Sequence, residues 1–179
     1  MLIERARSCL LVVDVQERLM PSIASMRTIL GRILLLMKAA RRLGVPMMAT
    51  EHWPENIGPI ATAVKNQLGG AEIFVKRHFD ATADGGFGPK LDKGRPQIVV
   101  CGTEAHVCVL QTTFGLLAAG MAPIVVADGV GSREPADKDL ALSRLRDAGV
   151  QVASAEMVVF EWLEQAGTPE FKDLITLIK

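Results

Sequence analysis

The chain has 179 residues, the usual length of one compact domain, and 49% of them are hydrophobic while 22% are charged. This balance excludes an intrinsically disordered chain and allows a substantial core. Twenty basic residues offset twenty acidic ones, so the composition also argues against a nucleic-acid partner, which would require a basic excess.

Other features of the sequence bear on its environment. The richest apolar run, residues 29–37, is too short to span a bilayer and contains Arg32. The first strand pattern starts near residue 8 and ends in Asp14, unlike a cleavable signal. Three cysteines without a CxxC pair argue against a disulfide framework and indicate a reducing compartment. We therefore expect a cytoplasmic protein with no membrane partner.

The first half of the chain alternates strand and helix patterns. Residues 8–14 are nearly all apolar, as expected of a strand buried on both faces of a parallel sheet. Residues 22–43 have apolar positions at helical spacing and end at Gly44, a normal stop signal. The other elements predicted here are a strand at 45–50, a loop at 51–59, a short helix at 60–68, a strand at 72–76 and a loop at 77–88.

The second half continues the alternation. Its predicted elements are a strand at 97–102, a helix at 107–119, a strand at 123–128, a helix at 135–148, a strand at 150–153 and helices at 156–165 and 169–179. Such alternation is typical of an α/β fold whose parallel sheet is covered by helices on both faces. With no internal repeat and no linker composition, we expect one domain over residues 1–179.

Cys108 has the most informative position of the three cysteines. The predicted strand before it ends at Gly102, and Cys108 opens the following helix. A thiol in the first turn of a helix lies in the positive field of the helix dipole, which we expect to favour the thiolate. Ligands of open α/β sheets also bind beyond the carboxyl ends of the strands. Cys9 and Cys101 lie inside apolar strands, and we interpret them as small buried hydrophobic residues.

Asp14, Lys76 and Asp128 also stand where apolar strands stop. For Asp14 or Lys76 alone, a solvated strand end is an equally good explanation. Together with Cys108 they make chemical sense, because a thiol needs a base to take its proton and a cation to hold the thiolate. Backbone N–H groups between Gly102 and Cys108 would hold the oxyanion of a tetrahedral intermediate. For Asp128 we expect a hydrogen-bonded loop anchor.

Three segments resemble the signature segments of the isochorismatase-like cysteine hydrolases. They are VDVQ at residues 13–16, VKRHF at 75–79 and GTEAHVCVLQT at 102–112. Residues 50–59, 126–133 and 171–174 are similar to the subgroup called isochorismatase domain-containing proteins. The resemblance runs nearly end to end, and the three signature segments occur in the family's order.

The resemblance implies a Rossmann-like three-layer αβα sandwich with a six-stranded parallel sheet in the order 3-2-1-4-5-6. It implies a catalytic triad of Asp14, Lys76 and Cys108, with the N–H groups of Glu104 and Cys108 as oxyanion donors. It also implies a non-proline cis peptide between Thr103 and Glu104. Members of the family usually form dimers or larger rings, so we expect a homo-oligomer.

Two differences from the wider superfamily reduce the number of reactions that this chain could catalyse. Nicotinamidases bind a metal through an Asp-x-His…His cluster after the second strand, whereas residues 51–56 here contain only His52. His78 and His106 are too far along the chain to complete a ligand set by spacing, so we expect no metal and no other cofactor. True isochorismatases lack the cysteine nucleophile, so Cys108 argues against that reaction. The sequence therefore predicts a hydrolase of a small amide or other C–N substrate that forms a thioester.

Four further residues are expected near the substrate. Trp53 lies in a loop where a ring could stack on a planar substrate, and Phe79 could form a pocket wall. Gln16 is expected to hold the first loop beside the pocket. His106 could line the pocket, although a structural role is the stronger interpretation. The roles of His52 and His78 stay open at this stage.

Two other functions remain open. The chain could be a pseudoenzyme or binding module that keeps the fold, or a redox-sensing thiol protein, because a thiol of low pKa is easily oxidised. The complete triad favours the hydrolase, since a chain released from catalysis has no need of the carboxylate and the cation together.

Overall fold

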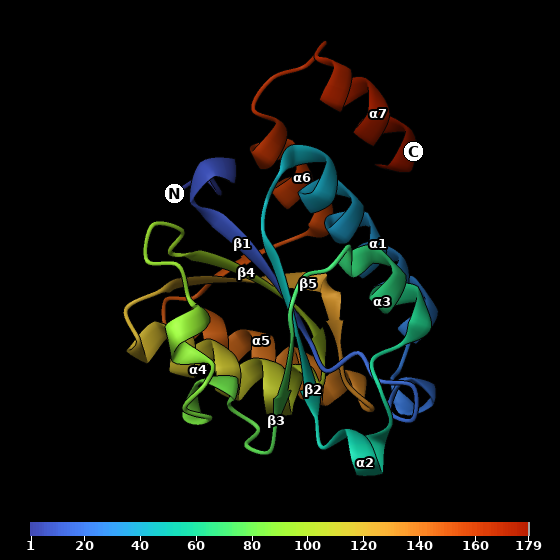
Figure 1. The fold of residues 1–179 in the computed structure, drawn as a ribbon, viewed down its shortest axis with the longest axis vertical. Coiled ribbons are helices and arrows are strands. Elements are labelled where there is room, and N and C mark those ends of the chain that lie inside the picture. The colour runs from blue at the N-terminus through green and yellow to red at the C-terminus, as the bar shows by residue number, and fades with distance from the viewer. Residues whose placement is uncertain (179) are drawn as a thin grey trace.

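The computed structural model describes residues 1–178 and has an α/β architecture around one six-stranded parallel sheet (Figure 1). The strand order β3-β2-β1-β4-β5-β6 confirms the order that the family resemblance implied. The strands are β1 (Ser8–Val13), β2 (Met47–His52), β3 (Ile73–Lys76), β4 (Gln97–Thr103), β5 (Ala122–Gly131) and β6 (Gln151–Ala153).

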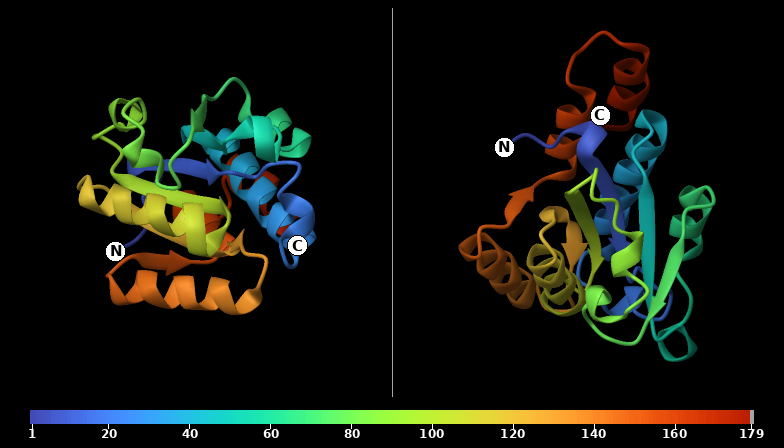
Figure 2. Two further views of the ribbon diagram at one scale, coloured as in Figure 1. Left: turned by 90° about the horizontal axis from the view of Figure 1, so that it is seen from below. Right: turned by 60° about the vertical axis from the view of Figure 1, so that its left-hand side comes forward.

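Helices cover both faces of this sheet (Figure 2). The helices are α1 (Met26–Leu43), α2 (Pro54–Ile57), α3 (Thr62–Leu68), α4 (Leu110–Ala118), α5 (Pro135–Asp147), α6 (Ala155–Leu163) and α7 (Pro169–Ile178). Helices α4 and α5 pack on one face, and α1, α3 and α6 pack on the other. Within residues 1–178, no helix combines the length and the hydropathy needed to cross a bilayer.

The side chains of β1 alternate between two hydrophobic cores. Leu10 and Val12 face α1 and α6, while Leu11 and Val13 face α4 and α5. Every residue of this strand is buried, which explains its continuous apolar sequence. On the first face, the buried Trp162 of α6 donates its indole N–H to Ser8 Oγ at 3.0 Å, which fixes α6 to the start of β1.

Three elements differ from the sequence predictions in ways that matter for the site. Strand β2 continues to His52, into the predicted loop at 51–59. Strand β5 does not stop at Asp128 but continues to Gly131, across a shift in register at which Val125 pairs with Val100 and Val130 with Gly102. Apolar periodicity could not reveal this bulge, because the Asp-Gly pair reads as a turn. The segment Ala105–Val109, labelled η5, is a π-helical turn that precedes α4.

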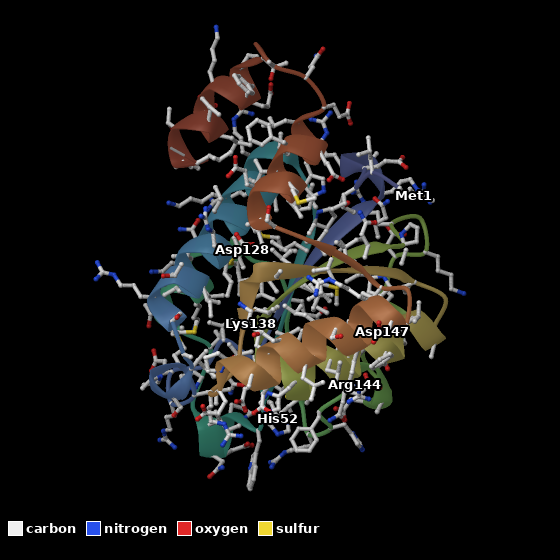
Figure 3. All side chains as sticks on the ribbon, turned by 180° about the vertical axis from the view of Figure 1, so that it is seen from behind. Met1, His52, Asp128, Lys138, Arg144 and Asp147 are labelled. Atoms are coloured by element: carbon white, nitrogen blue, oxygen red, sulfur yellow. The ribbon has the colours of Figure 1, made fainter. Side chains whose placement is uncertain are left out.

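Asp128 is therefore inside a strand, but it acts as the expected anchor. Its Oδ1 accepts a hydrogen bond from the N–H of Ala155 at 2.7 Å, and its Oδ2 lies 3.3 Å from Nε of Arg32. The carboxylate thus joins β5 to the first turn of α6 and to α1. Figure 3 shows Asp128 beside α1, far from His52 at the lower end of the molecule.

Gly102 gives a direct test of how closely β1 and β4 approach. Its φ is +124°, and an added Cβ would lie 2.0 Å from the carbonyl oxygen of Val13. We predict that Gly102→Ala lowers the free energy of unfolding by at least ~3 kcal/mol, as expected of overpacking at a strained backbone position. Denaturant unfolding followed by circular dichroism measures the change.

Gly31→Ala is the matched control for this prediction. Gly31 is exposed in the middle of α1, and a Cβ there meets nothing within 4 Å. The same substitution should therefore stabilise the chain by roughly 0.5–1 kcal/mol through helix propensity. Equal stability of wild type and Gly102→Ala would contradict the close approach of the two strands.

Candidate active site

A buried ion pair lies at the carboxyl ends of β1 and β3. Lys76 Nζ is 2.7 Å from Asp14 Oδ2, and the side chains are 0% and 1% exposed. The contact is an ion pair, and Oδ2 has no hydrogen-bond partner among the described residues. The structure therefore brings together two of the three residues that the sequence singled out.

The backbone and side chain of Asp14 are held from both neighbouring strands. Asp14 has φ +47°, a left-handed conformation that aspartate tolerates better than most residues. Thr50 Oγ1 of β2 donates to Asp14 Oδ1 at 2.6 Å, and Thr103 Oγ1 of β4 donates to the Asp14 carbonyl at 2.8 Å. Sequence reasoning missed both threonines, because a hydroxyl inside a strand gives no periodic signal.

The ammonium of Lys76 is close to three oxygen-bearing groups. Besides the Asp14 carboxylate, it donates to the carbonyl oxygens of His78 at 3.2 Å and Phe79 at 3.3 Å. The two carbonyls belong to the loop that follows β3. A fully buried lysine requires such compensation, because an unpaired ammonium away from water is strongly unfavourable.

The thiol of Cys108 is buried in η5, with 7% of the residue exposed. Burial raises the pKa of this thiol above its usual range, and the charge of Asp14 raises it further, while Lys76 has a smaller opposing effect. The expectation that the helix start favours the thiolate is therefore wrong, because burial and the Asp14 charge both raise the thiol pKa. Both charges act on this thiol, so the structure brings Cys108 to the Asp14–Lys76 pair.

Cys9 and Cys101 have no such neighbours. Both are buried inside strands, and burial raises the pKa of Cys9 to about 11 and that of Cys101 beyond its usual range. Neither thiol senses Asp14 or Lys76. Their interpretation as small core residues agrees with this environment.

The turn before Cys108 offers two backbone donors. The Thr103–Glu104 peptide is cis, at the position that the family resemblance implied. Within residues 1–178, the N–H of Glu104 donates to no acceptor, and that of Cys108 donates to none outside η5. The Glu104 side chain is held in place by Arg133, whose Nε donates to Oε1 at 2.9 Å. The turn can therefore present N–H groups to an oxyanion.

Gln16 anchors the loop around the site. Its Oε1 accepts from the His52 N–H at 2.8 Å, and its Nε2 donates to the carbonyls of His52 at 3.0 Å and Gly58 at 2.6 Å. Gln16 is 0% exposed, so its amide is committed to backbone groups. Gln16, which follows β1, thus ties the first loop to residues 52 and 58, and it leaves no amide group for a substrate.

Two aromatic residues lie at the rim. Trp53 and Phe79 are 43% and 49% exposed. The guanidinium of Arg77 lies 5.3 Å from the centre of the Trp53 ring, and the Phe79 ring lies 5.1 Å from that of His52. Both rings are thus available to solvent beside the buried pair.

His106 turns toward α5. Its Nδ1 is 2.9 Å from Ser132 Oγ and its Nε2 is 3.7 Å from Asp137 Oδ2. His78 is exposed and pairs with Asp84 at 2.9 Å. In residues 1–178, no three histidine, cysteine, aspartate or glutamate side chains gather in an arrangement that could hold a metal ion.

Known proteins resemble this chain over nearly its full length. A model of the family described as "Isochorismatase domain" matches residues 8–157. Isochorismatase domain-containing protein 2A of Mus musculus is 34% identical over 178 residues, which cover 96% of this chain and 82% of the mouse protein.

Two solved structures have the same fold. The structure of MAR1 ribonuclease from Caenorhabditis elegans is 32% identical, with a TM-score of 0.93 over 99% of this chain and 92% of that one. The ycaC gene product of Escherichia coli, described as an octameric hydrolase of unknown specificity, is 19% identical with a TM-score of 0.92, over 99% of this chain and 90% of that one. At that identity the likeness concerns the fold alone.

The two charges beside Cys108 predict opposite shifts in the pH at which its thiol reacts. Asp14→Asn removes a charge that raises the thiol pKa, so alkylation by iodoacetamide should start at lower pH than in wild type. Lys76→Met removes the opposing charge, so its profile should move to higher pH. Peptide mass spectrometry gives the alkylation rate of Cys108 at each pH.

Cys9 is the internal control of this experiment, because its pKa does not depend on Asp14 or Lys76. Losing one partner of a buried pair can cost about 3–5 kcal/mol, so each variant is first shown to be folded by its unfolding transition. A Cys108 profile that is the same in all three proteins would mean that the charges do not act on the thiol.

Proposed function

The chain belongs to the isochorismatase domain family, and on that premise we propose that it is a cysteine-dependent hydrolase of a small amide or another C–N substrate. The observation that carries the proposal is the thiol of Cys108 beside the buried Asp14–Lys76 pair, with both charges acting on its pKa. The triad residues are those that the family resemblance implies.

The raised thiol pKa determines how the first step would run. Cys108 rests as a neutral thiol, so Asp14 removes its proton as the sulfur attacks the substrate carbonyl. Lys76 stays paired with the carboxylate and offsets negative charge on the sulfur. The oxygen of the tetrahedral intermediate accepts hydrogen bonds from the N–H groups of Glu104 and Cys108.

The remaining steps return the enzyme to its starting state. Protonated Asp14 gives its proton to the leaving nitrogen, the C–N bond breaks and a thioester on Cys108 remains. A water molecule then attacks the thioester, with Asp14 as its base, and releases the carboxylic acid and the thiol. As the C–S bond breaks, protonated Asp14 returns this proton to the sulfur, so one carboxylate serves twice as base and twice as acid, and no histidine is required.

Ribonucleic acid is the other substrate class to test, because the Caenorhabditis elegans relative is named a ribonuclease. The present chain has twenty basic and twenty acidic residues, so it lacks the basic excess that a phosphate backbone requires. A fully buried thiol also suits a small substrate better than a polymer. We therefore favour the small C–N substrate.

A substrate screen with matched cysteine variants tests this function. Small aliphatic and aromatic amides, ureas, carbamates and a short RNA are offered to wild type, Cys108→Ala and Cys9→Ala. We predict turnover of at least one C–N substrate, which is lost in Cys108→Ala because the nucleophile is gone. Cys9→Ala should retain it, since Cys9 is as buried as Cys108, at 7% exposure, but lies away from the charged pair. Product formation and acyl-enzyme mass are the readouts.

The Asp14→Asn variant tests whether the Asp14 carboxylate acts as a base or only supports the structure. It keeps the shape of the side chain but cannot take a proton, so kcat/KM should fall by about 10²–10⁴ at every pH. Turnover that survives in Cys108→Ala would refute the covalent mechanism. If wild type shows neither turnover nor an acyl adduct, the result would favour a binding module. If the inactive wild type also forms a sulfenic acid rapidly at Cys108, the result would favour a redox sensor.

A further inference from the structure

His52 is a buried side chain next to the charged pair to which the mechanism assigns no role. It is the last residue of β2, the strand that lies between β1 and β3, and its register partner is Lys76. Side chains of a strand alternate between faces, so His52 shares the face of Thr50, whose hydroxyl reaches Asp14. Cys108 belongs to the core on this same face.

The imidazole of His52 has an unmatched polar atom. The residue is 9% exposed, and its Nδ1 is fully buried without a hydrogen-bond partner among the described residues. Leaving a buried polar atom unmatched is unfavourable by about 1–3 kcal/mol, and such atoms in folded proteins call for an explanation. The Gln16 amide binds the His52 N–H and carbonyl, so the backbone of His52 is fixed at the site.

The state of the ring follows from its surroundings. Burial lowers the pKa of His52, and the neighbouring Lys76 ammonium lowers it further, so the imidazole is neutral at physiological pH. A neutral imidazole has one acceptor nitrogen and one N–H donor. Nδ1 is the buried ring nitrogen whose hydrogen-bonding capacity is unused among the described residues.

We propose that His52 Nδ1 accepts a hydrogen bond from an N–H group of the substrate and so selects substrates whose reacting carbonyl bears nitrogen with at least one hydrogen. This inference rests on the proposed hydrolase function and specifies its substrate class. Primary amides, monosubstituted amides and ureas supply such a donor. Fully substituted amides and esters do not, and with them Nδ1 would stay unmatched after binding.

The ring of Phe79 provides the route to His52. It stacks on the imidazole at 5.1 Å with a tilt of 33°, and Phe79 is itself 49% exposed. Rotation of this one side chain would uncover His52 without moving the backbone carbonyl that binds Lys76. A planar amide could then lie against the imidazole in place of the phenyl ring.

Two small electrophiles test the selection without a known substrate. The probes are acrylamide, which has an NH₂ group, and N,N-dimethylacrylamide, which has no N–H. In each case the Cys108 sulfur adds to the terminal alkene carbon, the double bond becomes single, and the thiol proton ends on the carbon beside the carbonyl. Intact mass and peptide mapping give the rate at Cys108, and each rate is divided by that of a free thiol at the same pH.

Wild type should prefer acrylamide after this correction by about tenfold, the value of one hydrogen bond. His52→Phe keeps a flat ring against Phe79 but has no acceptor, so the ratio of its two corrected rates should fall to about one. His52→Gln keeps an acceptor oxygen and should restore part of the preference. Thermal unfolding confirms that each variant is folded.

The outcomes separate this inference from the function on which it rests. Equal corrected rates for the two probes in wild type would overturn the role of His52 while leaving Cys108 as a nucleophile. A His52→Phe variant that slows with both probes alike would also overturn it, since that result indicates a structural role. If neither probe labels Cys108, that result would contradict the nucleophile itself and the proposed function with it.

Discussion

The ion pair between Asp14 and Lys76 is the interaction on which the rest of the site depends. Each charge would be unfavourable by several kcal/mol if it were taken from water alone, so the fold must surround both with fixed dipoles. It does so with the hydroxyl of Thr50 and the carbonyls of His78 and Phe79. Thr50 lies in β2, and the two carbonyls lie in the loop after β3. The strand order therefore also determines which dipoles surround the two charges.

The nucleophile is fixed to the same point by the contact of β1 with β4. At Gly102 the two strands approach at backbone distance, because no Cβ fits against the Val13 carbonyl. The next residue, Thr103, donates to the Asp14 carbonyl, and the turn that carries Cys108 follows directly. The carboxylate and the thiol are thus positioned by one pair of central strands, and β3 adds the cation.

Much of this arrangement could be predicted from the sequence, because buried parallel strands are continuous apolar runs and their ends are conspicuous. Asp14 and Lys76 were found in that way. Local pattern could not show that β5 passes through Asp128, since a bulge depends on pairing with β4. Nor could it give the direction of the Cys108 pKa, which depends on burial and on a carboxylate 94 residues away in the chain. His52 gave no signal because its unmatched atom exists only in the folded chain.

The enclosed ammonium of Lys76 has a consequence for the design of inhibitors. It is paired with the Asp14 carboxylate and donates to two backbone carbonyls, so a ligand carboxylate or phosphate must compete with Asp14 for its charge. Uncharged electrophiles are therefore the better starting point for chemical probes of this protein, and anionic fragments the poorer one.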